Sequence, residues 1–340
     1  MIAEKTAIAV PTYEQYMGIK GPYFGDMVFE HLENDHPGKY ERIYMTVKAA
    51  SDGSEEIVTD AHMRERDVYV MHPQVLSPAQ HVMTAQEMSD DLIRSDAQQV
   101  ILFDLYNPYY SYDKRKGKQS INARTVADNY KAAGINRVFT VDPHSDLLVL
   151  AFGPECPLEP LSMQGPLAER FRESYELGGV TVCSPDIGGY PRAEVFADML
   201  DIPLVGIRKR RSEHDSDSTK ALEIVGDKKH IKGRKILFRD DVIRSGGSLL
   251  EAKNVLDEAG AEGYYAVATH LSLCGDARKR IKESGIKVIG TNTVPQKFAE
   301  DERSLYDVLD ISPIIAKIMY RRSEGMSISE FFRSSFGERK

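Results

Sequence analysis

Lys235–Gly260 reads KILFRDDVIRSGGSLLEAKNVLDEAG, and this stretch decides the fold. Its apolar start predicts a buried strand, and Leu249–Ala259 follows as an amphipathic helix that Gly260 ends. Two aspartates and a small-residue turn lie between the strand and the helix. A strand that leads through a polar turn into a helix is the repeating unit of open parallel sheets.

The same alternation recurs along the chain, so we predict an α/β protein with mainly parallel sheets. Strands are expected at 67–71, 100–105, 137–142, 180–186, 204–207, 235–241, 264–273 and 287–290, and further helices at 121–133 and 312–336. With 340 residues, the chain is too long for one ordinary core. The Gly/Pro-punctuated stretch 152–166 predicts domains at 1–157 and 158–310, followed by a helical segment at 311–340 that packs back on them. The segments AAGINRVFTVD and EAGAEGYYAVA form a weak internal echo that suggests duplication.

Composition excludes several classes of protein. A formal charge of −8 argues against a dedicated nucleic-acid binder. No apolar run approaches the ~20 residues that span a bilayer, and the N-terminus lacks the apolar stretch of a secretory signal. Cys156, Cys183 and Cys274 are widely spaced, without a zinc-type cluster. We expect a cytoplasmic protein that binds neither nucleic acid nor membrane.

The turn after the two aspartates has the features of a ribose-phosphate site. Asp240 and Asp241 can each accept a ribose hydroxyl, and the helix N-terminus can face a phosphate through the backbone amides of Ser245, Gly246, Gly247 and Ser248. A simpler interpretation makes Ser248 an N-cap that forms a capping box with Glu251. The two interpretations are compatible.

Two other strand ends carry candidate magnesium ligands. His144 follows the strand ending at Asp142, and Asp186 is the last residue of the strand that begins at Val180. Magnesium takes one or two protein ligands beside phosphate oxygens and water, which suits so sparse a set. Taken alone, a histidine is more often an ordinary surface or core residue, and Asp186 beside Pro185 equally fits a turn.

The basic run Arg208–Arg211 follows an apolar segment and precedes the polar stretch 212–220. Such a run in isolation is more often a solvated patch. In an extended strand, however, Lys209 and Arg211 would lie on one face, where they could clamp a transferring phosphate.

In this order, the motifs resemble those of the ribose-phosphate diphosphokinase family, also called phosphoribosyl pyrophosphate synthetase, from about residue 51 to 332. The matching blocks include RERDVYVM, VCSPDIGGYPRAEVFADMLDIPLVGIRKRR and EIVGDKKHIKGRKILFRDDVIRSGGSLLEA. Several blocks in one order are more specific than any single motif. The chain is identified as a divergent member of this family.

The resemblance implies two tandem phosphoribosyltransferase-like (Rossmann-like) domains with the active site between them. It also implies a homo-oligomer built from dimers, or a hexamer, in which a neighbouring subunit contributes to ATP binding. The expected reaction transfers the β,γ-diphosphate of ATP, with Mg²⁺, to the anomeric hydroxyl of ribose 5-phosphate, giving 5-phosphoribosyl 1-diphosphate and AMP. By position, Lys209, Arg211 and His144 are catalytic, His144 and Asp186 are associated with Mg²⁺, and the ribose-phosphate site comprises Asp240, Asp241, Arg244, Ser245, Gly246, Gly247 and Ser248.

The ATP half departs from the family pattern. Ala50 stands where the family has an adenine-stacking aromatic residue, and Tyr110–Arg115 lacks the family's Arg-Gln pair. The residues assigned to ATP binding are Asp52, Glu55, Tyr112, Lys114 and Arg115. A Lys-rich loop is also often simply solvated.

Arg244 replaces a common aspartate of the family, a change of two formal charges beside the expected 5-phosphate. ADP-ribose carries a diphosphate there, so the same transfer with ADP-ribose as the acceptor is the alternative reaction. A non-catalytic regulatory homologue and a base phosphoribosyltransferase are further alternatives. The first is suggested by the altered ATP half, and the second by the shared Asp-Asp turn.

Overall fold

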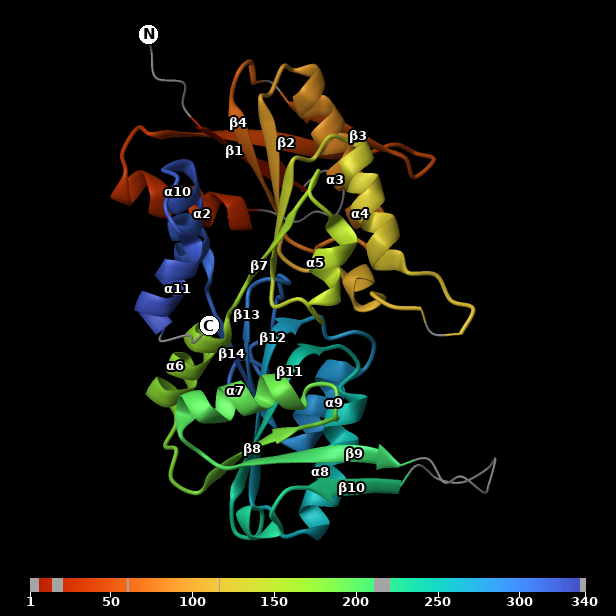
Figure 1. Ribbon diagram of the computed structural model, residues 1–340, viewed down its shortest axis with the longest axis vertical. Helices are drawn as coiled ribbons and strands as arrows, with labels where there is room; N and C mark the ends of the chain where they lie inside the picture. Colours follow the sequence, from red (N-terminus) through yellow and green to blue (C-terminus); the bar gives the residue numbers. More distant parts are fainter. Residues whose placement is uncertain (1–5, 14–20, 60, 116, 211–220, 337–340) are drawn as a thin grey trace. The chain divides into compact units, whose positions relative to one another are not determined.

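The computed structural model describes residues 6–13, 21–59, 61–115, 117–210 and 221–336. It divides into two compact units (Figure 1). The first comprises Met1–Leu161, Thr293–Pro295 and Asp310–Phe331, and the second comprises Ser162–Asn292, Gln296–Leu309 and Phe332–Lys340. Each unit contains one sheet of seven strands, all parallel except at one edge, with helices on both faces. The predicted α/β class with mainly parallel sheets is confirmed.

The first sheet has the order β3-β2-β1-β4-β5-β6-β7. Its inner strand β1 is apolar between its two terminal threonines because both of its faces are buried, Ala7 and Ala9 on one and Ile8 and Val10 on the other. The strands are β1 (Thr6–Thr12), β2 (Tyr40–Ala49), β3 (Glu55–Thr59), β4 (Asp67–His72), β5 (Gln99–Asp104), β6 (Arg137–Val141) and β7 (Leu158–Leu161). The helices are α2 (Phe24–Asp35), α3 (Pro78–Arg94), the 3-10 turn η1 (Pro108–Ser111), α4 (Asn122–Ala132) and α5 (Leu147–Phe152).

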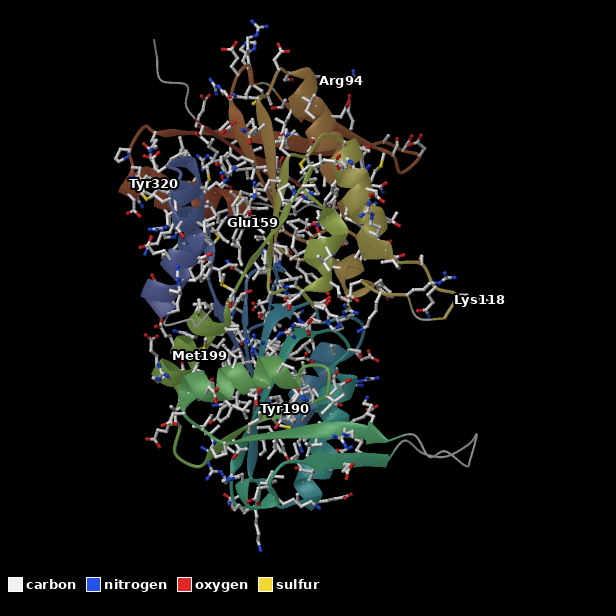
Figure 2. All side chains as sticks on the ribbon, viewed as in Figure 1. Arg94, Lys118, Glu159, Tyr190, Met199 and Tyr320 are labelled. Carbon is white, nitrogen blue, oxygen red and sulfur yellow. The ribbon has the colours of Figure 1, made fainter. Side chains whose placement is uncertain are left out.

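The second sheet has the order β10-β9-β8-β11-β12-β13-β14. Gly206 of β9 leaves room for the ring of Tyr190 (Figure 2), since an added Cβ would lie 2.6 Å from Tyr190 Cδ2. The strands are β8 (Val180–Ser184), β9 (Leu204–Arg210), β10 (Ala221–Val225), β11 (Lys235–Ile243), β12 (Gly263–Leu271), β13 (Lys287–Thr291) and β14 (Tyr306–Leu309). The helices are α6 (Gln164–Ser174), α7 (Tyr190–Leu200), the 3-10 turn η2 (Lys228–His230), α8 (Gly247–Glu258) and α9 (Ala277–Ser284).

The two sheets share one strand order, counted along the chain within each unit. This repetition supports a duplicated architecture. The sequence echo is nevertheless misleading, because it pairs β6 with β12, whereas the strand equivalent to β6 by order is β13. Helix-to-strand junctions resemble one another in all α/β proteins, which explains the false match.

The tail and the division between the units differ in detail from expectation. β7 completes the first sheet, so the first unit runs to Leu161 rather than to residue 157. The tail contains two helices, α10 (Ser312–Ser323) and α11 (Ile328–Phe336), instead of one continuous helical segment. α10 packs against α2, where the rings of His36 and Tyr320 stack with centroids 3.7 Å apart.

Among the described residues, no helix has both the length and the apolar character needed to cross a membrane.

The close approach of β12 and β13 yields a stability prediction. A Cβ on Gly290 would lie 2.8 Å from the carbonyl oxygen of Ala268 and 2.5 Å from Leu271 Cγ. Because a backbone carbonyl cannot move aside, Gly290→Ala should lower the free energy of unfolding by about 1–3 kcal/mol. Thermal or urea unfolding measures the change. Gly178→Ala is the matched control, since its Cβ would meet nothing within 4 Å, and equal effects of the two changes would contradict the packing described here.

Candidate functional site

Three neighbouring strands of the second sheet, β9, β8 and β11, bring predicted site residues together. Asp186 follows β8, and its Oδ1 accepts a hydrogen bond of 2.9 Å from the Gly189 amide. A Cβ built on Gly189 would lie 3.7 Å from Asp186 Oδ1 and 4.0 Å from Asp240 Oδ1. Asp186 and Asp240 therefore face one small volume, and glycine at 189 keeps that volume open.

Asp240 and Asp241 lie inside β11, not at its end as predicted, because β11 continues to Ile243 against β12. Burial, Asp241 and Asp186, in that order, raise the pKa of Asp240 well above its usual value. Asp241 is 5% exposed and pairs with Arg192 Nη1 at 3.3 Å. Such an excess of buried negative charge suits hydroxyl donors or a cation.

The turn after β11 opens helix α8 without a side-chain cap. α8 begins at Gly247, and Gly246, with φ of +71°, is the N-cap. The capping-box interpretation is wrong, because Ser248 lies within the helix and the Glu251 carboxylate pairs with Lys209 Nζ at 2.7 Å. Glycine at 246 is required by the left-handed backbone. The backbone amides of the first turn of α8 point toward its N-terminus, the arrangement that binds anions at the ends of helices.

Arg244 and Ser245 connect the strand to this helix. The Arg244 carbonyl accepts a 2.9 Å hydrogen bond from the Cys274 amide, which ties the turn to the end of β12. Ser245 is exposed, and its hydroxyl accepts a long hydrogen bond of 3.4 Å from Gly247 N. The half-buried Arg244 therefore lies directly beside the predicted phosphate turn.

Lys209 belongs to β9, which extends beyond its predicted end at Ile207 because it pairs with β10. It lies two residues after Ile207 and therefore on the same face of β9, where Ile207 is buried in the core together with Leu249 of α8. This shared face and the ion pair to Glu251 place Lys209 beside the first turns of α8. Arg211 lies outside the described residues.

In the first unit, His144 is exposed and follows β6. Asp142, two residues earlier, has a positive φ of +36° and donates its amide to the Leu161 carbonyl at 2.8 Å. Left-handed backbone at a non-glycine residue is costly and tends to occur at functional sites. The strand end that carries His144 therefore has a second mark of function that the sequence did not reveal.

The residues assigned to ATP divide between two places in the first unit. Asp52 lies in the turn between β2 and β3 and accepts hydrogen bonds from Ser54, and these bonds lower its pKa. Tyr112, Lys114 and Arg115 are exposed in the segment after η1. The Glu55 carboxylate accepts a hydrogen bond from the Thr84 hydroxyl of α3.

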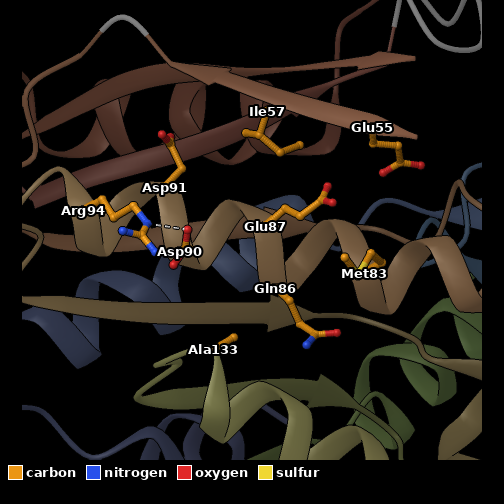
Figure 3. Close-up of a pocket in the computed structure, with 9 residues that line it drawn as sticks. All are labelled: Glu55, Ile57, Met83, Gln86, Glu87, Asp90, Asp91, Arg94 and Ala133. Atoms are coloured by element: carbon orange, nitrogen blue, oxygen red, sulfur yellow. Dashed lines mark hydrogen bonds and ion pairs between the residues drawn. The ribbon is translucent and has the colours of Figure 1, made fainter. Parts of the chain in front are cut away.

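Glu55 also lines a hollow of about 510 Å³ between β3 and α3 (Figure 3). Three further carboxylates line it, those of Glu87, Asp90 and Asp91. Burial and then Glu55 raise the pKa of Glu87, and burial and then Asp90 raise that of Asp91. So acidic a surface opposes phosphate binding at this place.

Within the described residues, no cluster of three or more His, Cys, Asp or Glu side chains could hold a metal ion by itself. This sparse set fits magnesium, which binds through one or two carboxylates and substrate oxygens. The shared volume between Asp186 and Asp240 has the required donor type.

Sequence reasoning missed three residues of this region. Arg192 pairs with Asp241, although the sequence separates them by a helix and two strands. Asp104 and Asp113 are buried carboxylates beside the predicted ATP segment. Asp104 is the last residue of β5 and Asp113 lies in the segment that follows, and this place could have indicated them, since strand ends were the positions searched.

Comparison with known proteins identifies the family. A model of the N-terminal domain of ribose phosphate pyrophosphokinase matches residues 17–134, and one of the phosphoribosyl synthetase-associated domain matches residues 202–333. The ribose-phosphate pyrophosphokinase of Caldanaerobacter subterraneus is 34% identical over 288 residues, covering 83% of this chain and 87% of the relative. The chain belongs to the ribose-phosphate pyrophosphokinase family.

Two further relatives of this family extend the match. The ribose-phosphate pyrophosphokinase of Wolinella succinogenes is 29% identical over 94% of this chain and 99% of its own length. The crystal structure of phosphoribosylpyrophosphate synthetase from Mycobacterium smegmatis aligns with a TM-score of 0.80 and 31% identity, covering 94% of this chain and all of that one. The expected pair of phosphoribosyltransferase-like domains and the expected diphosphokinase type of enzyme are confirmed.

The buried carboxylates generate a pH prediction. The raised pKa of Asp240 means that the folded protein binds this proton more tightly than the unfolded chain, so stability falls as pH rises from below 3.8 through the folded pKa. Asp240→Asn removes this dependence. Its melting temperature should exceed that of wild type by a few degrees at pH 8, with a smaller gap at pH 4.

Differential scanning fluorimetry at the two pH values measures this gap. Asp128→Asn is the control, because that side chain is 54% exposed on α4 and should produce no gap that grows with pH. A gap for Asp240→Asn that is equal at both pH values would contradict the raised pKa of Asp240, whose largest cause is burial.

Proposed function

We propose that the protein transfers the β,γ-diphosphate of ATP to the anomeric 1-hydroxyl of ribose 5-phosphate, giving 5-phosphoribosyl 1-diphosphate and AMP. The observation that carries the proposal is the pairing of two neighbouring carboxylates on β11, the half-buried Asp240 and the buried Asp241, with an uncapped helix N-terminus a few residues later. Hydroxyl groups suit the first feature and a phosphate suits the second. A phosphorylated ribose carries both kinds of group in one small molecule.

In this proposal each residue has a defined role. Asp240 and Asp241 accept the ribose 2- and 3-hydroxyls, and the turn Ser245–Ser248 receives the 5-phosphate. Lys209, with Arg211 and His144, neutralises charge that develops on the transferring group. The ion pair of Lys209 with Glu251 supports this role, because it holds the ammonium beside the phosphate turn.

Mg²⁺ bound to ATP would supply further charge neutralisation when present. Asp186 and His144 are the residues proposed to hold it. The raised pKa of Asp240, caused by burial, Asp241 and Asp186, supports a cation at this place because a cation would relieve the repulsion. ATP itself is proposed to contact Asp52, Glu55, Tyr112, Lys114 and Arg115. The uncharged part of the nucleotide, and not its phosphates, would occupy the acidic hollow lined by Glu55.

ADP-ribose is the second candidate acceptor, and Arg244 is the observation that favours it. Arg244 is half-buried and directly precedes the predicted phosphate turn in the chain, and its positive charge suits the second phosphate of ADP-ribose. The family relatives are named for ribose phosphate, which favours the smaller acceptor.

We also propose a homo-oligomer built from dimers.

The catalytic role of Lys209 predicts a specific loss of rate. Lys209→Ala should lower kcat for AMP release by about 10²–10³-fold, because one preorganised charge on the transferring group is removed. Lys229→Ala removes a comparable ion-paired lysine elsewhere in the second unit and should leave the rate unchanged. A fall of less than about threefold in Lys209→Ala would contradict a role in the transition state.

The acceptor is decided by a magnesium-dependent assay of AMP release with ribose 5-phosphate or ADP-ribose, with the product identified by mass. We expect AMP with ribose 5-phosphate, and Arg244→Ala should raise KM for the acceptor by about 10-fold or more, as for a lost hydrogen bond to a charged group. Arg280→Ala, an exposed change on α9, is the control. A response to ADP-ribose alone would establish the second candidate, and no AMP with either would refute both.

A further inference from the structure

The first unit contains a buried polar cluster at the carboxyl end of β5, apart from the residues given roles above. Asp104, the last residue of β5, is fully buried and accepts four hydrogen bonds. Its Oδ1 accepts from His81 Nε2 at 2.7 Å. Its Oδ2 accepts from the hydroxyls of Tyr110 (2.6 Å) and Tyr130 (3.0 Å) and from Asn107 Nδ2 (3.1 Å). We call these five residues the Asp104 hub.

A second buried histidine, His72, packs against His81 of the Asp104 hub. The ring of His72 stacks on that of His81, with centroids 3.9 Å apart. Burial, and then His81, lower the pKa of His72 to about 3, so its ring is neutral near pH 7. His72 Nε2 then donates to the His81 carbonyl at 2.9 Å, and Nδ1 accepts from the Tyr13 hydroxyl at 3.1 Å. The donor and the acceptor in both hydrogen bonds of the His72 ring are therefore determined.

The carboxylate of Asp104 is ionised in this arrangement. Burial alone would raise its pKa, but His81 and the hydrogen bond from the Tyr110 hydroxyl hold the pKa of Asp104 below its usual value. An ionised carboxylate accepts all four hydrogen bonds, and hydrogen bonds to a charged acceptor are the stronger kind.

The hub holds the start of the segment assigned to ATP. Asn107 and Tyr110 belong to the turn η1, and Asn107 Oδ1 also accepts from the Tyr109 amide at 3.1 Å. Two residues after Tyr110, the Tyr112 carbonyl accepts from the Ala123 amide at 3.2 Å. The backbone is therefore fixed up to Tyr112, while the side chain of Tyr112 is 49% exposed.

The same segment continues to the neighbour of His144. Asp113 is only 9% exposed, and its carboxylate accepts a hydrogen bond from the Ser145 hydroxyl. Ser145 Oγ accepts in turn from the Leu147 amide at 3.2 Å. Asp113 therefore connects the predicted ATP segment to the residue that follows His144.

We propose that Asp104 and Asp113 are positioning residues for nucleotide transfer: Asp104 fixes the segment 107–112 through Tyr110, and Asp113 fixes the His144 segment through Ser145. Neither carboxylate contacts substrate in this scheme. The inference rests on the proposed function for its kinetic consequence and on the structure alone for its conformational one.

Tyr110→Phe and Tyr130→Phe form a matched pair. Both tyrosines are buried, and each donates to Asp104 Oδ2. Tyr110 belongs to the turn before the ATP residues, whereas Tyr130 belongs to α4 and contacts that turn through a 3.3 Å hydrogen bond that its hydroxyl accepts from Asn107 Nδ2. Both changes should lower the melting temperature to a similar extent. Tyr110→Phe should raise KM for ATP by about fivefold or more and accelerate hydrogen exchange at residues 109–115, whereas Tyr130→Phe should change both less, because Tyr130 lies outside the segment and contacts it through the long bond from Asn107.

Equal changes in KM and in exchange for the two variants would refute a positioning role and leave the hub purely structural. If the wild-type enzyme releases no AMP with either acceptor, the proposed function fails, and the exchange measurement alone then decides the inference. In that case, unchanged exchange at 109–115 in Tyr110→Phe would refute it.

Variants of Asp113 test the second part of the proposal independently. Asp113→Ala should lower kcat by about tenfold and accelerate exchange at residues 143–147, because Ser145 loses its acceptor. Asp113→Asn should largely restore both, since an amide oxygen can still accept from the Ser145 hydroxyl. Equal loss in the two variants would contradict positioning through this hydrogen bond.

Discussion

The proximity of Asp240 to two other carboxylates at one end of the second sheet is the constraint on which the rest of the site depends. Carboxylates buried next to one another repel, and a folded protein keeps such an arrangement only where other interactions hold it. Here the parallel pairing of β8 and β11 fixes both backbones, and Arg192 offsets part of the charge on Asp241. The fold thereby maintains a site whose charge favours hydroxyl donors and cations.

Small residues give this site its space. Gly189 leaves open the volume that Asp186 and Asp240 share, and Gly206 lets the ring of Tyr190 lie close to β9. Gly246 adopts a left-handed conformation and starts α8 without a capping side chain. Each glycine is needed for a different physical reason, yet all three lie around one end of the same sheet. The first unit differs, because buried tyrosines and histidines fix its strand ends.

Much of the fold could be predicted from the sequence because parallel strands buried on both faces are continuous apolar runs. Between Asp67 and Thr291, every strand except β7 and β10 was predicted in this way, and the helix that begins at Gly247 was predicted to within two residues. The edge strands β3, β7, β10 and β14 were missed, since they are short and partly exposed, and the longer strands β1 and β2 were missed as well. The capping box was wrong because local spacing cannot reveal that Glu251 has a better partner in Lys209.

The sequence by itself determined the family, the chemistry of the Asp-Asp and Gly-Gly turn, and the residue types available for transfer. These features depend on the order of residues along one strand-turn-helix unit, which is local. Only the tertiary structure decided that Asp186 raises the pKa of Asp240, that Arg192 pairs with Asp241, and that Asp104 gathers partners from three different elements. Such contacts join residues that are distant along the chain, and they exist only once neighbouring strands fix which side chains share a common volume.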